Sequence, residues 1–281
     1  MNQPSHRPTY PPFGLILTAV VLICALMSGL KTIGGWGTYI TESKLERFMR
    51  VHELTLDAYP PELLDLMARN PETEDFVVNY PLNKNKTFPI DLSEYQNSSS
   101  VPLLMQWDER WGYETYGSGL LAMTGCGPTC LSMVTIYLTH DTSFHPGAAA
   151  AFSTAHGYAV KGNGTSWTLM SEGGPLLGMN VKEIPLDRDR LTDQLRQGHP
   201  VVCIMGPGDF TETGHYIVMT GIEKGKIRIN DPNLLTGLLG QRHAQVSNQR
   251  RLTALTFGTE ECQHIRAIGK PRLIKRAKGF L

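Results

Sequence analysis

The chain has no surplus of charge of either sign. Its 26 basic and 26 acidic residues cancel over 281 residues. Proteins that bind nucleic acid through electrostatics carry a basic excess or a basic stripe, so this balance argues against nucleic acid as a partner. The apolar fraction of 41% is that of an ordinary globular protein, which also argues against a disordered chain.

Cysteine is scarce and shows no organised spacing. The five cysteines are Cys24, Cys126, Cys130, Cys203 and Cys262. An odd number without regular spacing does not form a disulfide framework, and no paired CxxC motifs indicate a zinc site. We assign Cys24 to an apolar segment near the N-terminus, which leaves four cysteines to be explained.

Residues 13–30, FGLILTAVVLICALMSGL, form an apolar run of 18 residues without a charge. A bilayer core needs about 20 apolar residues, so this run, after a short tail of residues 1–12, predicts a single transmembrane helix. A cleaved signal peptide is the alternative, but its apolar core would be shorter and would end in small residues spaced like A-x-A. Leu26, Met27 and Ser28 make a poor cleavage site, so we favour an uncleaved span.

The flanking charges bear on the orientation of this span. Lys31, Lys44, Arg47 and Arg50 follow it, whereas Arg7 precedes it, a count that by itself favours a cytoplasmic C-terminus. Three of the four following charges lie well beyond the span, and large domains translocate largely regardless of charge. We therefore expect a single-pass membrane protein whose domain after the span is extracellular.

Residues 31–100 are predicted to form a connecting region. Residues 62–69 follow two prolines and have helical apolar spacing, with Asn70 and Pro71 as the stop signal. The run QNSSS at 96–100 is typical of a flexible linker. We expect the main domain to cover residues 101–281.

Within the main domain, helix signals come first and strand signals follow. Helices are predicted at 126–139, 146–156, 166–177 with a break near Gly173 and Gly174, and 187–197 with Gly198 as the C-terminal cap. Strands are predicted at 200–205, 215–222 and 226–230, with a tight turn at 223–225 and a further edge strand at 266–268. Such an order favours an α+β fold in which an antiparallel sheet packs against a helical half.

The strongest local signal for chemistry is the motif Gly125-Cys126-Gly127-Pro128 at the start of an apolar helix. Proline is tolerated in the first helical turn, so Pro128 places the helix start close to Cys126. The positive end of the helix dipole favours a thiolate there. A cysteine chosen at random is more often a buried structural residue, and we interpret Cys130 and Cys203 in that way.

A nucleophilic thiol needs a base, and among nine histidines His215 is best placed, at the start of a predicted strand. Asp231 follows the next strand, and paired strands lie roughly 5 Å apart, so its carboxylate can reach the imidazole. Gln106 is a candidate donor to the oxyanion, beside the backbone N–H of Cys126. The aromatic residues Trp107, Trp111 and Tyr113 could line the core or the walls of a groove, and we favour the core.

Three segments together resemble a known family. Residues 101–134, GHYIVMTG at 214–221 and NDP at 230–232 are similar to the free-standing, bacteriocin-processing (double-glycine-type) cysteine peptidases of the papain-like superfamily. The resemblance implies a papain-like α+β fold with Gln106 as oxyanion donor, Cys126 as nucleophile, His215 as base and Asp231 as its orienting partner. It also implies that Gly164, Thr165, Ser166 and Trp167 lie beside the substrate groove.

The sequence departs from that family in one respect: it has no GxxxxGK[ST] phosphate loop and no length for an export ATPase. Cleavage of leader peptides is therefore not implied. We expect a membrane-anchored cysteine peptidase that needs no cofactor or metal and acts on a peptide or on a peptidoglycan-derived amide. The alternatives are a non-catalytic module that binds peptide or cell wall on the same fold, and a metal site built from Cys126, Cys130, His215 and Asp231.

Overall fold

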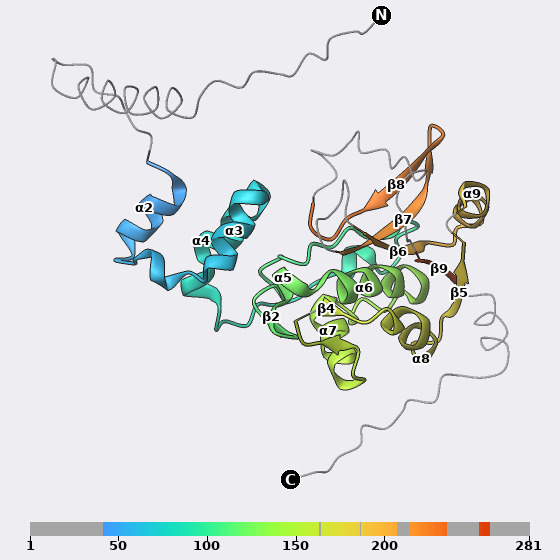
Figure 1. The fold of residues 1–281 in the computed structure, drawn as a ribbon, viewed down its shortest axis with the longest axis horizontal. Helices are drawn as coiled ribbons and strands as arrows, with labels where there is room; N and C mark the ends of the chain where they lie inside the picture. The colour runs from blue at the N-terminus through green and yellow to red at the C-terminus, as the bar shows by residue number, and fades with distance from the viewer. Residues whose placement is uncertain (1–41, 163, 186, 207–213, 235–252, 259–281) are drawn as a thin grey trace, which may run out of the picture. The chain divides into compact units, whose positions relative to one another are not determined.

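A computed structural model describes residues 42–162, 164–185, 187–206, 214–234 and 253–258 (Figure 1). Residues Phe48–Leu281 form one compact unit, which contains every element discussed below except the start of helix α2 (Lys44–Val51). The predicted transmembrane segment at residues 13–30 lies outside the described residues. Within the described parts of the chain, no helix has both the length and the apolar character needed to cross a bilayer.

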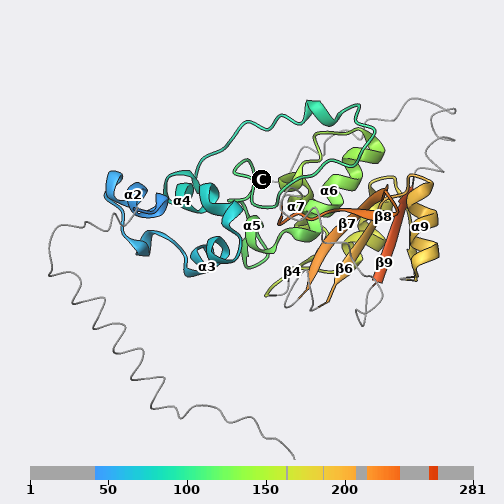
Figure 2. The same ribbon diagram turned by 90° about the horizontal axis from the view of Figure 1, so that it is seen from above.

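The C-terminal half of the unit contains a five-stranded antiparallel sheet. Its strands are β5 (Asn180–Ile184), β9 (Thr253–Gly258), β6 (Val201–Met205), β7 (His215–Glu223) and β8 (Lys226–Asn230), in that spatial order. Figure 2 shows β7, β6 and β9 side by side. The predictions of β6, β7, β8 and an antiparallel sheet are confirmed. Strands β5 and β9 had not been predicted, and the strand predicted at 266–268 lies outside the described residues.

The turn that joins β7 to β8 has the form expected for a tight hairpin. Lys224 and Gly225 both adopt positive φ, 50° and 75°. Such mirror-image turns match the right-handed twist of paired strands. The hairpin therefore brings the start of β7 close to the end of β8, with Val218 opposite Asn230.

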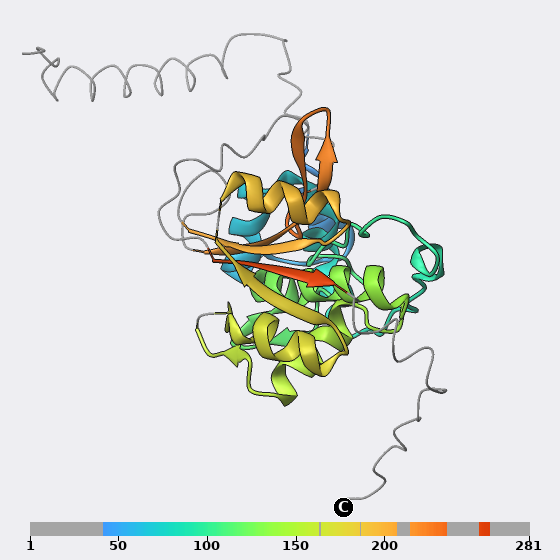
Figure 3. The same ribbon diagram turned by 90° about the vertical axis from the view of Figure 1, so that its right-hand side faces the viewer.

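The sheet is covered by a helix on each face, α6 (Cys126–Thr139) on one and α9 (Arg188–Arg196) on the other. Figure 3 shows the sheet between the green α6 and the gold α9. Successive side chains alternate between the two layers, because strand residues point to opposite faces. Val202 and Val218 pack in the core that contains α6, and Cys203 and Ile217 pack in the core that contains α9.

The predicted helices are confirmed in part. Helix α7 (Pro146–Ala155) and α9 occupy the expected ranges, Asp187 caps α9, and Gly198 ends it with a φ of 80°. The helix predicted at 166–177 is shorter, consisting of a π-helical turn (η4, Leu169–Gly173) followed by α8 (Gly174–Leu176). Ser166 lies outside it, and its N–H donates to the carbonyl of Tyr158.

Helices upstream of the predicted main domain pack into the same unit. Helix α3 (Pro61–Arg69) confirms the prediction for 62–69, whereas α4 (Glu74–Asn83) had not been predicted. Phe76 of α4 stacks on Tyr113 with ring centroids 4.3 Å apart, and Leu92 lies in the core around α6. The division of the chain at residue 101 stays a prediction, and residues on both sides of it share one core.

Candidate active site

Cys126 is the first residue of α6, preceded by the cap residue Gly125. Pro128 in the first turn sacrifices no helical hydrogen bond, because the first N–H groups of a helix have no partner within it. The backbone N–H groups of Gly127 and Tyr216 face the sulfur and help to lower the pKa of the thiol. The side chain is partly exposed, in contrast to Cys130 on the next turn, so it is the thiol that a substrate can reach.

Because Gly127 has no side chain, Thr165 can pack closely against the start of α6, next to Cys126. A Cβ at this position would lie 2.6 Å from the hydroxyl oxygen of Thr165, closer than real contacts allow. The Thr165 hydroxyl in turn hydrogen-bonds to the Tyr116 hydroxyl at 2.8 Å, and that hydroxyl meets Ser153 at the same distance. A buried chain of hydroxyl groups therefore supports the start of α6, and the sequence had given no signal for Tyr116 or Ser153.

His215 and Asp231 meet at the mouth of the β7–β8 hairpin. His215 Nε2 lies 2.7 Å from Asp231 Oδ1, and the two residues are only 9% and 4% exposed. Because Nε2 faces the carboxylate, Nδ1 is the ring nitrogen left for the Cys126 thiol, whose pKa the imidazole lowers. The structure therefore brings the three predicted residues together in the order thiol, imidazole, carboxylate.

The charges of this cluster favour a thiolate facing an imidazolium. Burial raises the pKa of the Cys126 thiol, but the hydrogen bond and positive charge of His215 outweigh it and lower that pKa below its ordinary value. Burial lowers the pKa of His215, whereas the bonds to Asp231 and Cys126 raise it to about 10. Because the thiol loses its proton more easily and the imidazole holds its proton more tightly, the ion pair is favoured over the neutral pair of thiol and imidazole.

Gln106 is buried next to this cluster, and both its backbone and its side chain donate hydrogen bonds. Its N–H donates to the carbonyl of Pro232, which follows Asp231, at 2.8 Å. Its Nε2 donates to the carbonyl of Ala122 at 2.7 Å, which uses one of the two amide hydrogens. The second hydrogen remains for another acceptor, so the residue keeps the donor that an oxyanion requires.

The segment predicted to line the substrate groove is divided between two environments. Thr165, at the end of strand β4 (Gly164–Thr165), turns its side chain inward against Gly127. Ser166 pairs its hydroxyl with that of Thr168. Trp167 stacks on Tyr216, next to His215, with ring centroids 5.8 Å apart, and its buried indole N–H has no partner. A groove role stays a prediction for Gly164, Ser166 and Trp167, and the Thr165 side chain serves the interior.

The remaining cysteines and the predicted core aromatics have structural surroundings. Cys130 and Cys203 are fully buried, and burial raises both pKa values, that of Cys203 to about 12. Trp111 and Tyr113 are buried as expected, whereas Trp107 is only half-buried. Among the described residues, no cluster of three His, Cys, Asp or Glu side chains could hold a metal ion. The structure therefore gives no support to the alternative of a metal site.

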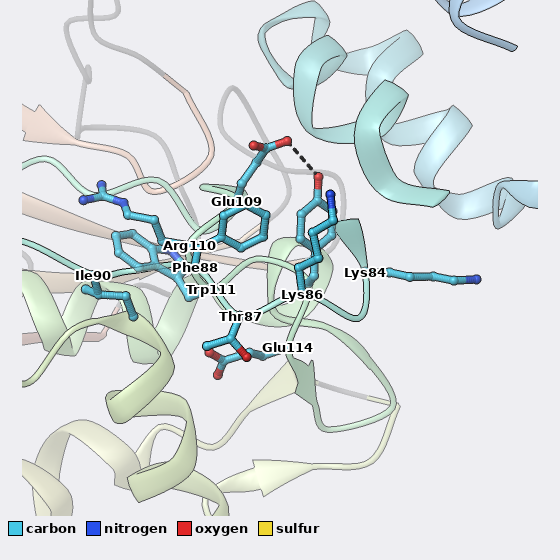
Figure 4. A pocket seen from close by; sticks show the side chains of 10 residues that line it. Lys84, Lys86, Thr87, Phe88, Ile90, Glu109, Arg110, Trp111 and Glu114 are labelled. Atoms are coloured by element: carbon cyan, nitrogen blue, oxygen red, sulfur yellow. Dashed lines mark hydrogen bonds between the residues drawn. The ribbon is translucent and has the colours of Figure 1, made fainter. Parts of the chain in front are cut away.

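A separate pocket contains none of the three clustered residues (Figure 4). It is lined by residues 84, 86–88, 90, 109–111, 113 and 114. Several of its polar groups bind within the protein: Arg110 binds Asp108 at 2.7 Å, Lys86 donates to Asn83, and the Tyr113 hydroxyl donates to Glu109. The pocket lies beside the C-terminal end of α4 and is distinct from the Cys126 cluster.

A thiol at a helix start, opposite an imidazole and a carboxylate on an antiparallel sheet, is the arrangement of papain-like cysteine peptidases. Residues 98–245, more than half of the chain, match the model of the "Peptidase C39 like" family, and the chain belongs to this family. The papain-like α+β fold and the predicted family resemblance are thereby confirmed.

Comparison with individual proteins adds little to this assignment. A crystal structure of a proposed C39-like peptidase from Bacillus anthracis is 17% identical with a TM-score of 0.34, and the match covers 58% of this chain and 94% of that chain. No curated protein matches the chain.

Proposed function

We propose that this protein is a cysteine peptidase that hydrolyses amide bonds with Cys126 as nucleophile, His215 as acid and base, and Asp231 as orienting residue. The observation that carries the proposal is the 2.7 Å contact of His215 with Asp231 beside the Cys126 thiol, whose pKa the imidazole lowers. The thiol lies at a helix N-terminus, where a thiolate is favoured. Family membership supports the same chemistry.

The reaction follows from the positions of the three groups. His215 takes the thiol proton, and the Cys126 sulfur attacks the carbonyl carbon, so that the carbonyl electron pair moves onto oxygen. The C–N bond then breaks as the imidazolium gives its proton to the leaving amine. A water molecule, deprotonated by His215, attacks the resulting thioester and releases the acid and the thiol.

The oxyanion formed in each step is stabilised by two donors, the second amide hydrogen of Gln106 and the backbone N–H of Cys126. Gln106 is suited to this role because the Ala122 carbonyl fixes its amide group. Its backbone N–H also binds the loop that carries Asp231. The donor and the orienting carboxylate are therefore held on one rigid frame.

Labelling of the full chain with an iodoacetamide probe across pH tests the proposal. Cys126 is expected to react fastest, with an apparent pKa well below the value of about 8.5 of an unperturbed thiol. Replacement His215→Ala is expected to remove this shift, because the imidazolium that stabilises the thiolate is lost. Peptide mapping measures each cysteine separately, and equal rates for Cys126 and the buried Cys130 would contradict the proposal.

We also propose that residues 13–30 anchor the protein in the membrane with the peptidase domain outside the cell. The 18-residue uncharged run supports an anchor, and a peptide or peptidoglycan amide outside the cell suits the proposed chemistry. A protease added to intact cells is expected to cleave the domain. Complete protection in intact cells, with cleavage after lysis, would place the domain in the cytoplasm.

A further inference from the structure

The carbonyl oxygen of Asn233, two residues beyond Asp231, is held by two side-chain donors. Asn70 Nδ2 donates to it at 2.6 Å, and Trp107 Nε1 donates to it at 3.0 Å. The N–H of the same residue, Asn233, donates to Asp231 Oδ1 at 2.8 Å, the oxygen that also faces His215. We call the two donors Asn70 and Trp107 the Asn233 clamp.

Asn70 is itself fixed in place. It lies at the junction of α3 and the 3₁₀ turn η2 (Pro71–Thr73) and is only 4% exposed. Its N–H donates to Leu66 O, and its side-chain Oδ1 accepts from the N–H of Glu72 at 3.2 Å. Because Oδ1 of the Asn70 amide caps the turn, Nδ2 is directed at Asn233.

The Asn233 clamp joins two distant parts of the chain. Asn70 is 163 residues from Asn233 and lies outside the region, residues 98–245, that matches the family model. We propose that Asn70 and Trp107 are positioning residues that fix the Asp231 loop, so that the helical segment before residue 98 completes the peptidase site. This inference rests on the proposed function and extends it to a segment that the family match does not include.

The physical argument concerns the direction of the Asp231 carboxylate. The N–H and the C=O of Asn233 lie in the same turn. The two donors that fix the carbonyl therefore also fix the position of the N–H that donates to Asp231. When a donor is lost, the turn gains freedom and the carboxylate spends less time facing His215. The imidazolium is then less stabilised, and so is the thiolate that depends on it.

Serine at position 70 separates this role from a capping role. Serine is as good a cap as asparagine, so Asn70→Ser keeps an acceptor for the turn, but its short side chain cannot reach Asn233. Asn83→Ser is the matched control, since Asn83 donates its amide to Glu109 and makes no contact with the Asp231 loop. The full chain is labelled with iodoacetamide across pH, and melting temperatures are recorded for each variant.

In Asn70→Ser we expect the apparent pKa of Cys126 to rise by roughly half a unit, the effect of one neutral hydrogen bond, and the alkylation rate at neutral pH to fall by up to about threefold. Asn83→Ser is expected to match the wild type in both quantities. Trp107→Phe, which keeps the aromatic ring and removes the other donor, is expected to shift the pKa in the same direction. Trp107→Phe still tests the inference if Asn70→Ser does not fold.

Two contrary results have different meanings. A wild-type protein in which Cys126 shows no lowered pKa would overturn the proposed function, and the inference would fall with it. A wild-type protein with a lowered pKa that neither Asn70→Ser nor Trp107→Phe changes would leave the peptidase proposal standing and overturn the role of the Asn233 clamp.

Discussion

Amide hydrolysis by the full chain is expected to fall by at least about 10⁴-fold when Cys126 is replaced by alanine, because the covalent route is then closed. Only the oxyanion donors and substrate binding remain, and in a comparable hydrolase these leave about 10³-fold to 10⁴-fold over the reaction in water. The measurement is the appearance of new peptide termini, by mass spectrometry, from a mixed peptide library and from peptidoglycan fragments.

Cys130→Ala is the matched control for this experiment. Cys130 lies on the same helix, one turn from Cys126, but is fully buried, with its pKa raised by burial. Its replacement removes a sulfur from the core and is expected to lower stability while leaving the rate of hydrolysis within a few-fold of wild type. Equal rates for wild type and Cys126→Ala would exclude a thiol mechanism.

The helix that begins at Cys126 could be predicted because the signal is local. Glycine, cysteine, glycine and proline in sequence fix the start of α6 through the conformational limits of each residue. The β7–β8 hairpin was equally accessible, since its two strands are joined by two turn residues, Lys224 and Gly225. A short connection leaves few ways to pair the strands, so the proximity of His215 and Asp231 followed from the sequence as well.

Contacts between distant segments could not be predicted in this way. Strand β9 lies between β5 and β6, although about fifty residues separate it from β6 in the chain. Hydrophobic periodicity indicates which face of a strand is buried but does not identify its partner. The bond from Asn70 to Asn233 was hidden for the same reason.

Helix α4 was missed because its sequence, EDFVVNYPLN, lacks the spacing of an amphipathic helix. Its consecutive residues Phe76, Val77 and Val78 are all buried, and Pro81 lies within it. A helix that is covered on several sides loses the periodicity by which an exposed helix is identified. The packing of α4 against Tyr113 was therefore not visible in the pattern of the chain.

Replacement Asp231→Asn is expected to lower the rate of hydrolysis by about 10²-fold to 10⁴-fold. The amide keeps the size of the carboxylate and an oxygen that can accept from the N–H of Asn233, so the turn is preserved. The negative charge that faces His215 is lost. Asp187→Asn is the matched control. Like Asp231, Asp187 accepts from the backbone, in its case from two N–H groups, but it caps the exposed start of α9.

The pH dependence of the residual rate separates loss of charge from loss of shape. In the wild type the thiolate forms above a lowered Cys126 pKa, and the imidazolium persists up to the His215 pKa of about 10. Without the Asp231 charge the His215 pKa falls, and the Cys126 pKa rises because its imidazolium partner is less stable. The pH range in which hydrolysis is fast should therefore narrow from both sides. An unchanged pH range with a lower maximal rate would show that Asp231 acts through the shape of the loop and not through its charge.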